Sequence, residues 1–283
     1  MSDEYTDSVL YSRLAATVEE SSPFASVLKE LSATEHGHYE FWKKYSPEEP
    51  PRVARAKLYW ILFLRRLFGL TFAARYLDRH ESSVVSAYRG LNSLIPAEDR
   101  PAFDAMVADE EQHEKAFAQK IESTAIQYIS FVVLGLADAL VEITGIHAGS
   151  LGIYNVTEYA GVAGLVAGAA ASLAMASAAF AQAKQGFKGS ARLSATYTGI
   201  SYFITAIILA TPYFLTPNMV YALAASLVLA VIIVTLITYY STVISGKPFL
   251  RDFLEIVGIM FGVTIVLYFF GSFVGVSTGI RIS

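Results

Sequence analysis

The apolar residues of this sequence follow different patterns in its two halves. From Tyr128 onward, long apolar stretches with few charges succeed one another, and we interpret five of them as membrane spans, at about residues 126–150, 157–182, 195–215, 217–243 and 253–275. Each is long enough to cross a hydrocarbon core of about 30 Å, which takes about 20 helical residues. One such stretch also fits a buried helix of a soluble protein, but five in succession favour a membrane domain.

Residues 3–120 have a helical pattern, with few β-branched runs and no strand-like alternation. Pro and Ser clusters divide this half, so that helices are expected at about 3–20, 24–45, 71–93 and 101–122, with a linking helix at 52–68. The sequence therefore predicts an all-α chain. It would consist of a cytosolic four-helix bundle in residues 1–122 and a five-helix transmembrane domain in residues 123–283.

Charge and composition restrict the partners of the chain. Residues 1–122 hold 20 of the 25 acidic residues and 15 of the 21 basic ones, so the strongly basic surface of a nucleic-acid-binding protein is absent. The chain has no cysteine. Any bound metal ion must therefore be held by carboxylate, imidazole or thioether groups, which suit Fe²⁺ and Mn²⁺ as well as Zn²⁺.

The ends of the spans predict an orientation in the cell membrane. The acidic start of the chain lacks the apolar region of a signal peptide, so the first half is expected in the cytosol. The connections at 183–194 and 244–252 carry Lys or Arg, whereas those at 151–156 and 212–218 carry neither. Because positively charged loops face the cytosol, five spans would place the N-terminus inside and the C-terminus outside.

Two carboxylates lie inside the first predicted span. Asp138 and Glu142 are one helical turn apart, so their side chains share a face. An Asp at the bilayer centre costs about 2.5–3.5 kcal/mol on insertion scales, and the spans contain no Lys or Arg to neutralise it. A cation is the natural partner, although a carboxylate wetted at the cytosolic mouth is the alternative. Met175 can add a thioether ligand or simply pack. His147 is a further candidate ligand, but its position near the outer end fits an interfacial residue better.

Small residues are frequent in the first two spans. Gly145 and Gly149 are four residues apart, as are Gly164 and Gly168. This spacing lets helix backbones approach closely, and it fits either ordinary helix packing or the lining of a pore.

The first half of the chain contains a duplicated set of possible metal ligands. In each copy a Glu precedes a Tyr by seven residues on one helix, and a Glu-x-x-His motif follows on the next helix: Glu4, Tyr11, Glu35 and His38 in the first copy, and Glu81, Tyr88, Glu110 and His113 in the second. Glu and His three residues apart share a helix face and can reach one ion. One such motif is common on solvated helices, but two copies with matching partners predict a site for two cations.

The second half resembles the vacuolar iron transporter family over roughly residues 123–275. The resemblance is carried by Gly135-Leu-Ala-Asp138 and by Ser172-Leu-Ala-Met175 in a span rich in Gly and Ala. It implies a homodimer with five spans that exports Fe²⁺ or Mn²⁺ in exchange for protons, with Asp138 and Met175 on the ion path. The family commonly has a Glu where this chain has Ala167, and Glu142 is a candidate to replace it.

Residues 3–120 resemble the rubrerythrin and ferritin-like family through the duplicated motif. That resemblance implies a four-helix di-iron site with Glu4, Glu35, His38, Glu81, Glu110 and His113 as ligands and with Tyr11 and Tyr88 beside them, in which Mn²⁺ or Zn²⁺ can replace iron. Val84 stands where rubrerythrins have a further Glu, and the Cys-bound iron that supplies their electrons has no ligands here. Iron capture or sensing is therefore expected, and a membrane-anchored ferroxidase or peroxidase is the alternative.

A basic and aromatic segment lies between the two copies. Residues 52–66 hold five Lys or Arg residues around the apolar run Leu58 to Leu64, which is too short to span a bilayer. Such a helix fits the anionic inner leaflet of a membrane, or else a place beneath the bundle or at a dimer contact.

Overall fold

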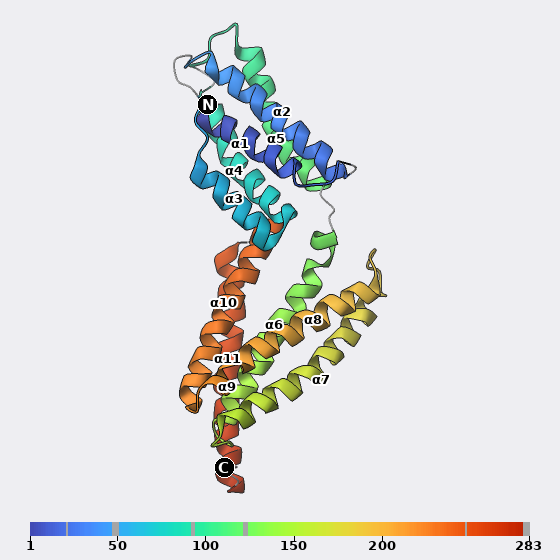
Figure 1. Cartoon of the computed structure of the whole chain (residues 1–283), viewed down its shortest axis with the longest axis vertical. Helices are drawn as coiled ribbons and strands as arrows, with labels where there is room; N and C mark the ends of the chain where they lie inside the picture. The colour runs from blue at the N-terminus through green and yellow to red at the C-terminus, as the bar shows by residue number, and fades with distance from the viewer. Residues whose placement is uncertain (21, 47–50, 92–93, 121–123, 247, 280–283) are drawn as a thin grey trace. The chain divides into compact units, whose positions relative to one another are not determined.

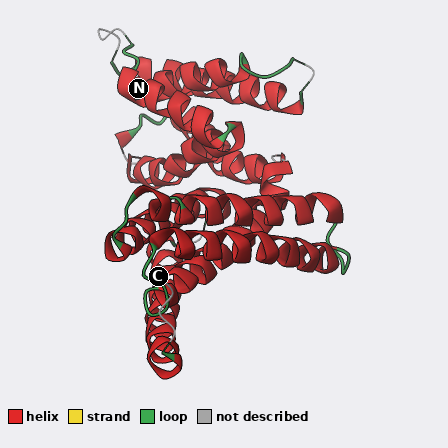
Figure 2. Cartoon of the chain, turned by 60° about the horizontal axis from the view of Figure 1, so that its bottom comes forward, coloured by secondary structure: helices red, strands yellow, loops and turns green. Residues whose placement is uncertain are grey.

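The part of the chain that the structure describes consists of helices joined by loops and turns (Figures 1 and 2). The structure is a computed structural model, and it describes residues 1–20, 22–46, 51–91, 94–120, 124–246 and 248–279. For residues 23, 78–87, 89, 111–120 and 124–126 the description is limited to the backbone. No strand occurs among the described residues, which confirms the prediction of an all-α chain.

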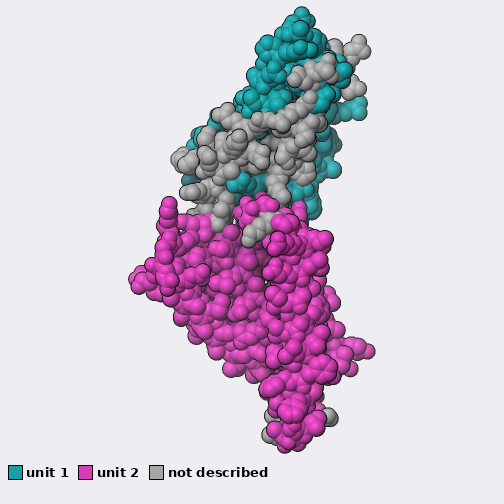
Figure 3. All heavy atoms as spheres, turned by 180° about the vertical axis from the view of Figure 1, so that it is seen from behind, with its two compact units in different colours: residues 1–123 teal, residues 124–283 magenta. Residues whose placement is uncertain are grey.

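The chain divides into two compact units, residues 1–123 and 124–283, which Figure 3 shows in different colours. In the first unit the helices are α1 Ser2–Ala15, α2 Pro23–Lys43, α3 Arg55–Phe68, α4 Leu70–Leu91 and α5 Arg100–Lys120. Helix α1 packs against α2, α4 packs against α5, and contacts between α2 and α5 join the two pairs. The unit is therefore built from two helix pairs, with α3 between them in the chain.

Local signals position the first two helices. Ser22 accepts a hydrogen bond from the N–H of Phe24, which starts α2 behind Pro23. Helix α1 was expected to run to about residue 20 but ends at Ala15. Beyond Ala15 the backbone turns more tightly, since the N–H groups of Thr17 and Val18 donate to the carbonyls of Leu14 and Ala15, three residues back, at 3.1 Å each.

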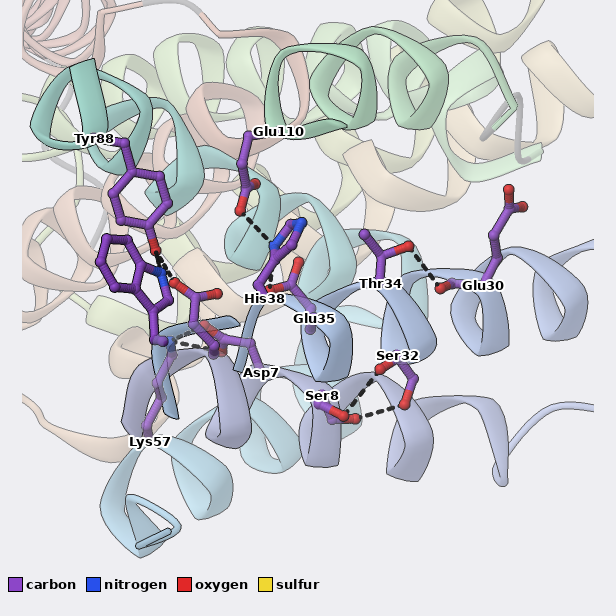
Figure 4. A network of polar contacts seen from close by, with 12 residues as sticks. Asp7, Ser8, Glu30, Ser32, Thr34, Glu35, His38, Lys57, Tyr88 and Glu110 are labelled. Carbon is purple, nitrogen blue, oxygen red and sulfur yellow. Dashed lines mark hydrogen bonds and ion pairs between the residues drawn. The ribbon is translucent and has the colours of Figure 1, made fainter. Parts of the chain in front are cut away.

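A reciprocal pair of serines joins α1 to α2. The hydroxyl of Ser8 donates to the carbonyl of Ser32 at 2.9 Å, and the hydroxyl of Ser32 donates to the carbonyl of Ser8 at 2.8 Å (Figure 4). Two small side chains at this position let the helices approach closely and fix their register. Glu4 and Glu35, each about one turn away from these serines, are thereby held on adjoining helices.

The second unit contains α6 Thr124–Ser150, α7 Thr157–Ala183, α8 Ala191–Ala210, the short α9 Pro212–Leu215, α10 Met219–Ser245 and α11 Phe249–Thr278. Five stretches of described residues are long and apolar enough to cross a membrane: Gln127–Ser150, Thr157–Ala183, Ala191–Leu215, Met219–Ser245 and Phe249–Thr278. The second unit therefore has the composition of a multi-pass membrane domain. Helix α6, which carries Asp138 and Glu142, contacts α7, α8, α10 and α11 and is the central helix of the unit.

The third span is interrupted near its end. It was expected to be continuous over 195–215, but α8 ends at Ala210 and Pro212 begins the separate helix α9. Proline lacks a backbone N–H and starts a helix more readily than it continues one. The connection to α10 then follows at Thr216, and Asn218 caps α10 by accepting from the N–H groups of Val220 and Tyr221 at 3.0 and 3.1 Å.

Glycines bring α11 into backbone contact with α6 and with the turn that follows α6. A methyl group built on Gly271 would lie 2.0 Å from the carbonyl oxygen of Gly149, and one built on Gly275 would lie 2.0 Å from that of Gly152. On α7, a methyl group on Gly168 would lie 2.6 Å from the Cβ of Ala206. The predicted close approach of helices at Gly149 and Gly168 is thus confirmed, whereas pore lining by these glycines stays a prediction.

Candidate metal site and transmembrane carboxylates

Four of the six predicted ligands of the first unit come together in its interior. Glu4 of α1, Glu35 and His38 of α2, and Glu110 of α5 each offer one ligand atom, and these atoms all lie within 4.8 Å of one another. The four residues are at most 7% exposed. They come from helices of both pairs, so the fold gathers them from distant parts of the sequence.

His38 lies between two carboxylates. Its Nδ1 is 3.0 Å from Oε1 of Glu110 and 3.7 Å from Oε2 of Glu35, and Figure 4 shows Glu35 and Glu110 on different sides of the imidazole. The contact with Glu35 follows from the i, i+3 spacing on α2. The contact with Glu110 depends on the packing of α2 against α5.

The electrostatics of this group favour a bound cation. Burial by itself lowers the pKa of His38, but the hydrogen bonds and charges of Glu110 and Glu35 outweigh burial and raise it to about 10. His38 is therefore protonated at neutral pH in the metal-free protein. One imidazolium does not balance the carboxylates of Glu4, Glu35 and Glu110, each of which loses hydration worth several kcal/mol on burial. A divalent cation bound by all four side chains would balance them, and carboxylate and imidazole are ligands that suit Fe²⁺, Mn²⁺ and Zn²⁺.

Tyr88 connects the two copies of the motif. Its hydroxyl donates a hydrogen bond to Glu4, and it accepts one from Nε1 of Trp42 at 3.2 Å. Burial and the adjacent charge of Glu4 both raise the pKa of Tyr88, so its hydroxyl stays protonated and remains a donor. Tyr88, which belongs to the second copy of the motif, therefore contacts the Glu of the first copy.

For the other predicted residues of this site, the structure gives the helix on which each lies but not every side chain. Glu81 lies on α4 and His113 lies on α5, one turn after Glu110, but their side chains are outside the described part of the chain. Tyr11 is buried on α1, with 1% of its surface exposed. The described side chains therefore form one group of four ligands, and the second cation position stays a prediction.

The sequence analysis missed two residues beside this group. Trp42 lies four residues after His38 on the same face of α2, so the spacing could have placed it beside the ligands, although not its hydrogen bond to Tyr88 of α4. Asp7, one turn after Glu4, forms an ion pair with Lys57 of α3 at 2.7 Å. Burial raises the pKa of Asp7, although Lys57 acts in the opposite direction. This ion pair ties α3 to the helix that carries Glu4.

The transmembrane carboxylates have a hydroxyl partner from another helix. Asp138 and Glu142 are half-buried on α6, and the hydroxyl of Tyr202 on α8 donates to Oε2 of Glu142 at 2.5 Å. Tyr202 is fully buried, and the sequence analysis missed it. Its signal was a stripe of polar residues in an apolar span, since Thr198, Tyr202 and Thr205 recur at helical spacing and all three are buried.

Met175 and Ala167 lie on α7, both partly buried. Met175 packs against the apolar cluster of α6, α8, α10 and α11 that includes Tyr202. The described residues of the second unit contain no group of three or more Asp, Glu or His ligands. Asp138 and Glu142 therefore form a pair, and the contribution of Met175 to ion binding stays a prediction.

His147 is not the interfacial residue that its position near the end of α6 indicated. It is fully buried, and its ring packs on that of Tyr213 with centroids 4.1 Å apart. The absence of a side chain at Gly164 makes room for it, since a methyl group there would lie 2.3 Å from Nε2 of His147. The interfacial interpretation was wrong because it considered the height of the residue along the span and not the helix that it faces.

A cavity of about 220 Å³ lies among α6, α10 and α11. Its lining includes the polar side chains of Ser130, Thr238, Ser241, Ser245 and Asp252. Asp252 belongs to the first turn of α11 and Ser245 ends α10, so the cavity lies toward the end of the unit where these helices are joined. The sequence analysis did not assign Asp252 to a site.

Comparisons of the chain with protein-family models, with curated proteins and with solved structures give no match. The two family resemblances therefore depend on the quoted motifs alone, and functional conclusions have to be argued from the residues and their geometry.

Proposed function

We propose that this protein is a membrane transporter that exports a divalent metal ion from the cytosol, with Fe²⁺ as the main substrate and Mn²⁺ as a second one. In this proposal its first unit is a cytosolic ferritin-like domain that captures or senses the same ion. The observation that carries the proposal is the buried group Glu4, Glu35, His38 and Glu110, whose ligand atoms lie within 4.8 Å of one another. Three buried carboxylates around one imidazole are costly without a cation and suited to one of charge two.

The arrangement of the helices supports a ferritin-like assignment. Such domains take one Glu from a helix and a Glu-x-x-His pair from the next, twice over, with all ligands facing the bundle interior. In this chain Glu4 of α1 and the pair Glu35 and His38 of α2 match the first half of that scheme, and Glu110 of α5 matches the second. Bound iron would supply a centre able to hold or oxidise Fe²⁺, and the chain's own residues would bind it and exclude water.

The membrane unit supports passage of the ion. Asp138 and Glu142 lie on the central helix α6, and the hydroxyl of Tyr202 orients Glu142. We assign the cavity at Asp252 to the cytosolic entrance, because the connection between α10 and α11 is one of the two with basic residues. A carboxylate that takes up a proton loses its charge and its hold on a cation, so protons from the outer side would release the ion and drive export as antiport.

Flux through the purified full chain tests this proposal. Proteoliposomes that contain an iron-sensitive dye would report Fe²⁺ transport, and Asp138→Asn is expected to abolish it. Glu158→Gln is the matched control, since Glu158 is an exposed carboxylate in the first turn of α7 and should be dispensable. Unchanged flux in Asp138→Asn would reject the assignment of Asp138 to the ion path, and no flux with the unaltered chain would reject transport.

The same preparation distinguishes a membrane-anchored ferroxidase. Fe²⁺ addition would then consume oxygen without any flux, and Glu35→Gln would abolish that consumption. For an exporter, Glu35→Gln is expected to lower transport at low iron concentration, where capture limits the rate, and to leave transport at saturating iron intact.

A further inference from the structure

Helix α3 exposes an apolar surface that the rest of its unit does not cover. Its inner face, Leu58, Ile61 and Leu64, is at most 5% exposed and packs into the unit. On another side lie Tyr59, Trp60, Phe63 and Leu67, which are 67%, 47%, 52% and 55% exposed, and we call these four residues the aromatic strip. The spacing of the strip places its members on one side of the helix, and Trp60 stacks on Phe63 with ring centroids 5.7 Å apart.

Two arginines border the aromatic strip. With about 3.6 residues per turn, Arg55 and Arg66 fall on the same edge of the helix, next to Tyr59. Both are exposed, and neither forms an ion pair with any residue that the structure describes. The other two basic residues of α3 are held by the unit itself, since Lys57 pairs with Asp7 and Arg65 donates to the carbonyl of Thr17 at 3.2 Å.

The charge of the strip's surroundings differs from that of the unit. Residues 1–122 have more acidic than basic residues, 20 against 15, whereas residues 52–66 contain five basic residues and no acidic one. An anionic surface is therefore attracted to α3 and repelled by the unit's average charge. Aromatic side chains bordered by arginine are typical of helices that lie in the headgroup region of a bilayer.

We propose that α3 docks the first unit onto an anionic lipid surface, with the aromatic strip at the boundary between headgroups and acyl chains. The lipid surface is the bilayer that holds the second unit, because the first span begins at Gln127, a few residues after the end of α5 at Lys120. That tether keeps a lipid surface within reach of α3 at all times. The proposal depends on the membrane location of the second unit and not on the metal site, so it can fail or hold independently of iron transport.

The chain provides its own probe for this contact. It contains two tryptophans, Trp42 and Trp60, and both belong to the first unit. Trp42 is half-buried and hydrogen-bonded to Tyr88, whereas Trp60 is part of the aromatic strip. The fluorescence of the full chain and that of Trp60→Phe, measured in the same nanodiscs, therefore give the signal of Trp60 by difference.

The experiment places the full chain in nanodiscs of phosphatidylglycerol whose acyl chains are brominated near the headgroup. Bromine quenches tryptophan only at contact, so the Trp60 signal is expected to be quenched and the Trp42 signal to be retained. Neutralising both border residues in Arg55→Gln/Arg66→Gln should lower the ratio of docked to undocked protein by more than about tenfold, because each basic residue near an anionic surface adds about 1 kcal/mol to binding. The matched control is Arg13→Gln/Arg100→Gln, which removes two exposed arginines from α1 and α5.

Other results would overturn the proposal. Unquenched Trp60 in brominated phosphatidylglycerol nanodiscs would show that the strip does not touch lipid. The unaltered chain in brominated phosphatidylglycerol is the reference. If Trp60 is quenched as strongly in the Arg55→Gln/Arg66→Gln variant, and as strongly in brominated phosphatidylcholine, then the aromatic strip does not bind anionic headgroups. If the strip instead contacts a second copy, Trp60 would escape bromine, and Phe63→Cys, the only cysteine in the chain, would form a disulfide between copies. Retained Trp42 emission shows that each variant is folded.

Discussion

Nδ1 of His38 lies 3.0 Å from Oε1 of Glu110, so one contact joins the two helix pairs of the first unit at the centre of the buried ligand group. Among the four side chains of this group, His38 is the one that can carry a positive charge. In the metal-free protein it partly balances three carboxylates. A bound divalent cation would take over that function, and the two states of His38 lead to the first three predictions.

Metal binding should depend on His38 and not on its neighbour His36. The two histidines are two residues apart on α2, but the side chain of His38 is 5% exposed within the ligand group, whereas that of His36 is 55% exposed near Glu40. His38→Ala is expected to weaken binding of Co²⁺, a spectroscopic substitute for Fe²⁺, by at least about tenfold, since even residues that only support a ligand have effects of this size. His36→Ala should leave the visible absorption titration unchanged, and equal losses in both variants would show that the site lies elsewhere.

Metal uptake by the first unit should release a proton. The pKa of His38 in the metal-free protein is raised to about 10 by Glu110 and Glu35, so at pH 7.5 the imidazole is protonated, and it must lose this proton to bind a metal. Titration calorimetry in two buffers of different ionisation enthalpy is expected to give about one proton released per metal ion, fewer in His38→Gln. Affinity should therefore rise with pH toward 10. An affinity that is flat between pH 6.5 and 9 would contradict the assigned ligand.

The same shift makes the metal-free unit less stable at alkaline pH. The pKa of His38 in the folded unit, about 10, exceeds its ordinary value of 6.5. The stabilisation from its protonated form is therefore complete below pH 6.5 and is lost as the pH rises from there toward 10. Tryptophan fluorescence follows unfolding of this unit alone, since both tryptophans lie in it. In a chelator, the unit's resistance to denaturant is expected to fall over this pH range, and less so in His38→Gln.

The helices and the motifs could be predicted because each depends on residues close together in the sequence. Five spans follow from apolar length, and the face shared by Glu35 and His38 follows from a spacing of three. The partners that cross between helices could not be predicted in this way. Tyr88 lies beside Glu4, and Tyr202 lies beside Glu142, because of how helices pack, and no local spacing encodes that packing.

His147 shows that packing between helices can also bury a residue that its position in the sequence places at the interface. Its place along α6 indicated the outer interface, but Gly164 on α7 and Tyr213 on α9 enclose it. A glycine in one helix can bury a polar residue of another, and only the pairing of the two helices reveals it. The end of α1 at Ala15 was missed for a different reason, because the helix closes there in a tight backbone turn at Thr17 and Val18, before any strong breaker occurs in the sequence.

The backbone contact between α6 and α11 should be sensitive to a single methyl group. A Cβ at residue 271 would lie 2.0 Å from the carbonyl oxygen of Gly149, and a backbone atom cannot move aside as a flexible side chain can. Gly271→Ala is expected to destabilise the second unit by about 1–3 kcal/mol, the usual cost of overpacking, or more if α11 separates. Gly262→Ala is the matched control on the same helix, since a Cβ there meets nothing within 4 Å. Titration with sodium dodecyl sulfate, followed by circular dichroism at 222 nm, measures both, and equal midpoints would show that α6 and α11 do not pack through Gly149.

Tyr202 should control transport through Glu142. Its hydroxyl donates to Glu142 Oε2 at 2.5 Å from inside the apolar core, and Phe at this position would preserve the packed ring while removing the donor. Because the hydrogen bond orients a carboxylate that we assign to the ion path, Tyr202→Phe is expected to lower Fe²⁺ flux in proteoliposomes by about 10–100-fold, as for other residues that orient a metal ligand. Tyr197→Phe on the same helix is the control, since Tyr197 is 38% exposed and its ring contacts Tyr128. If Tyr202→Phe transports iron as fast as Tyr197→Phe, Glu142 does not bind the ion in passage, and the path must depend on Asp138 with other partners.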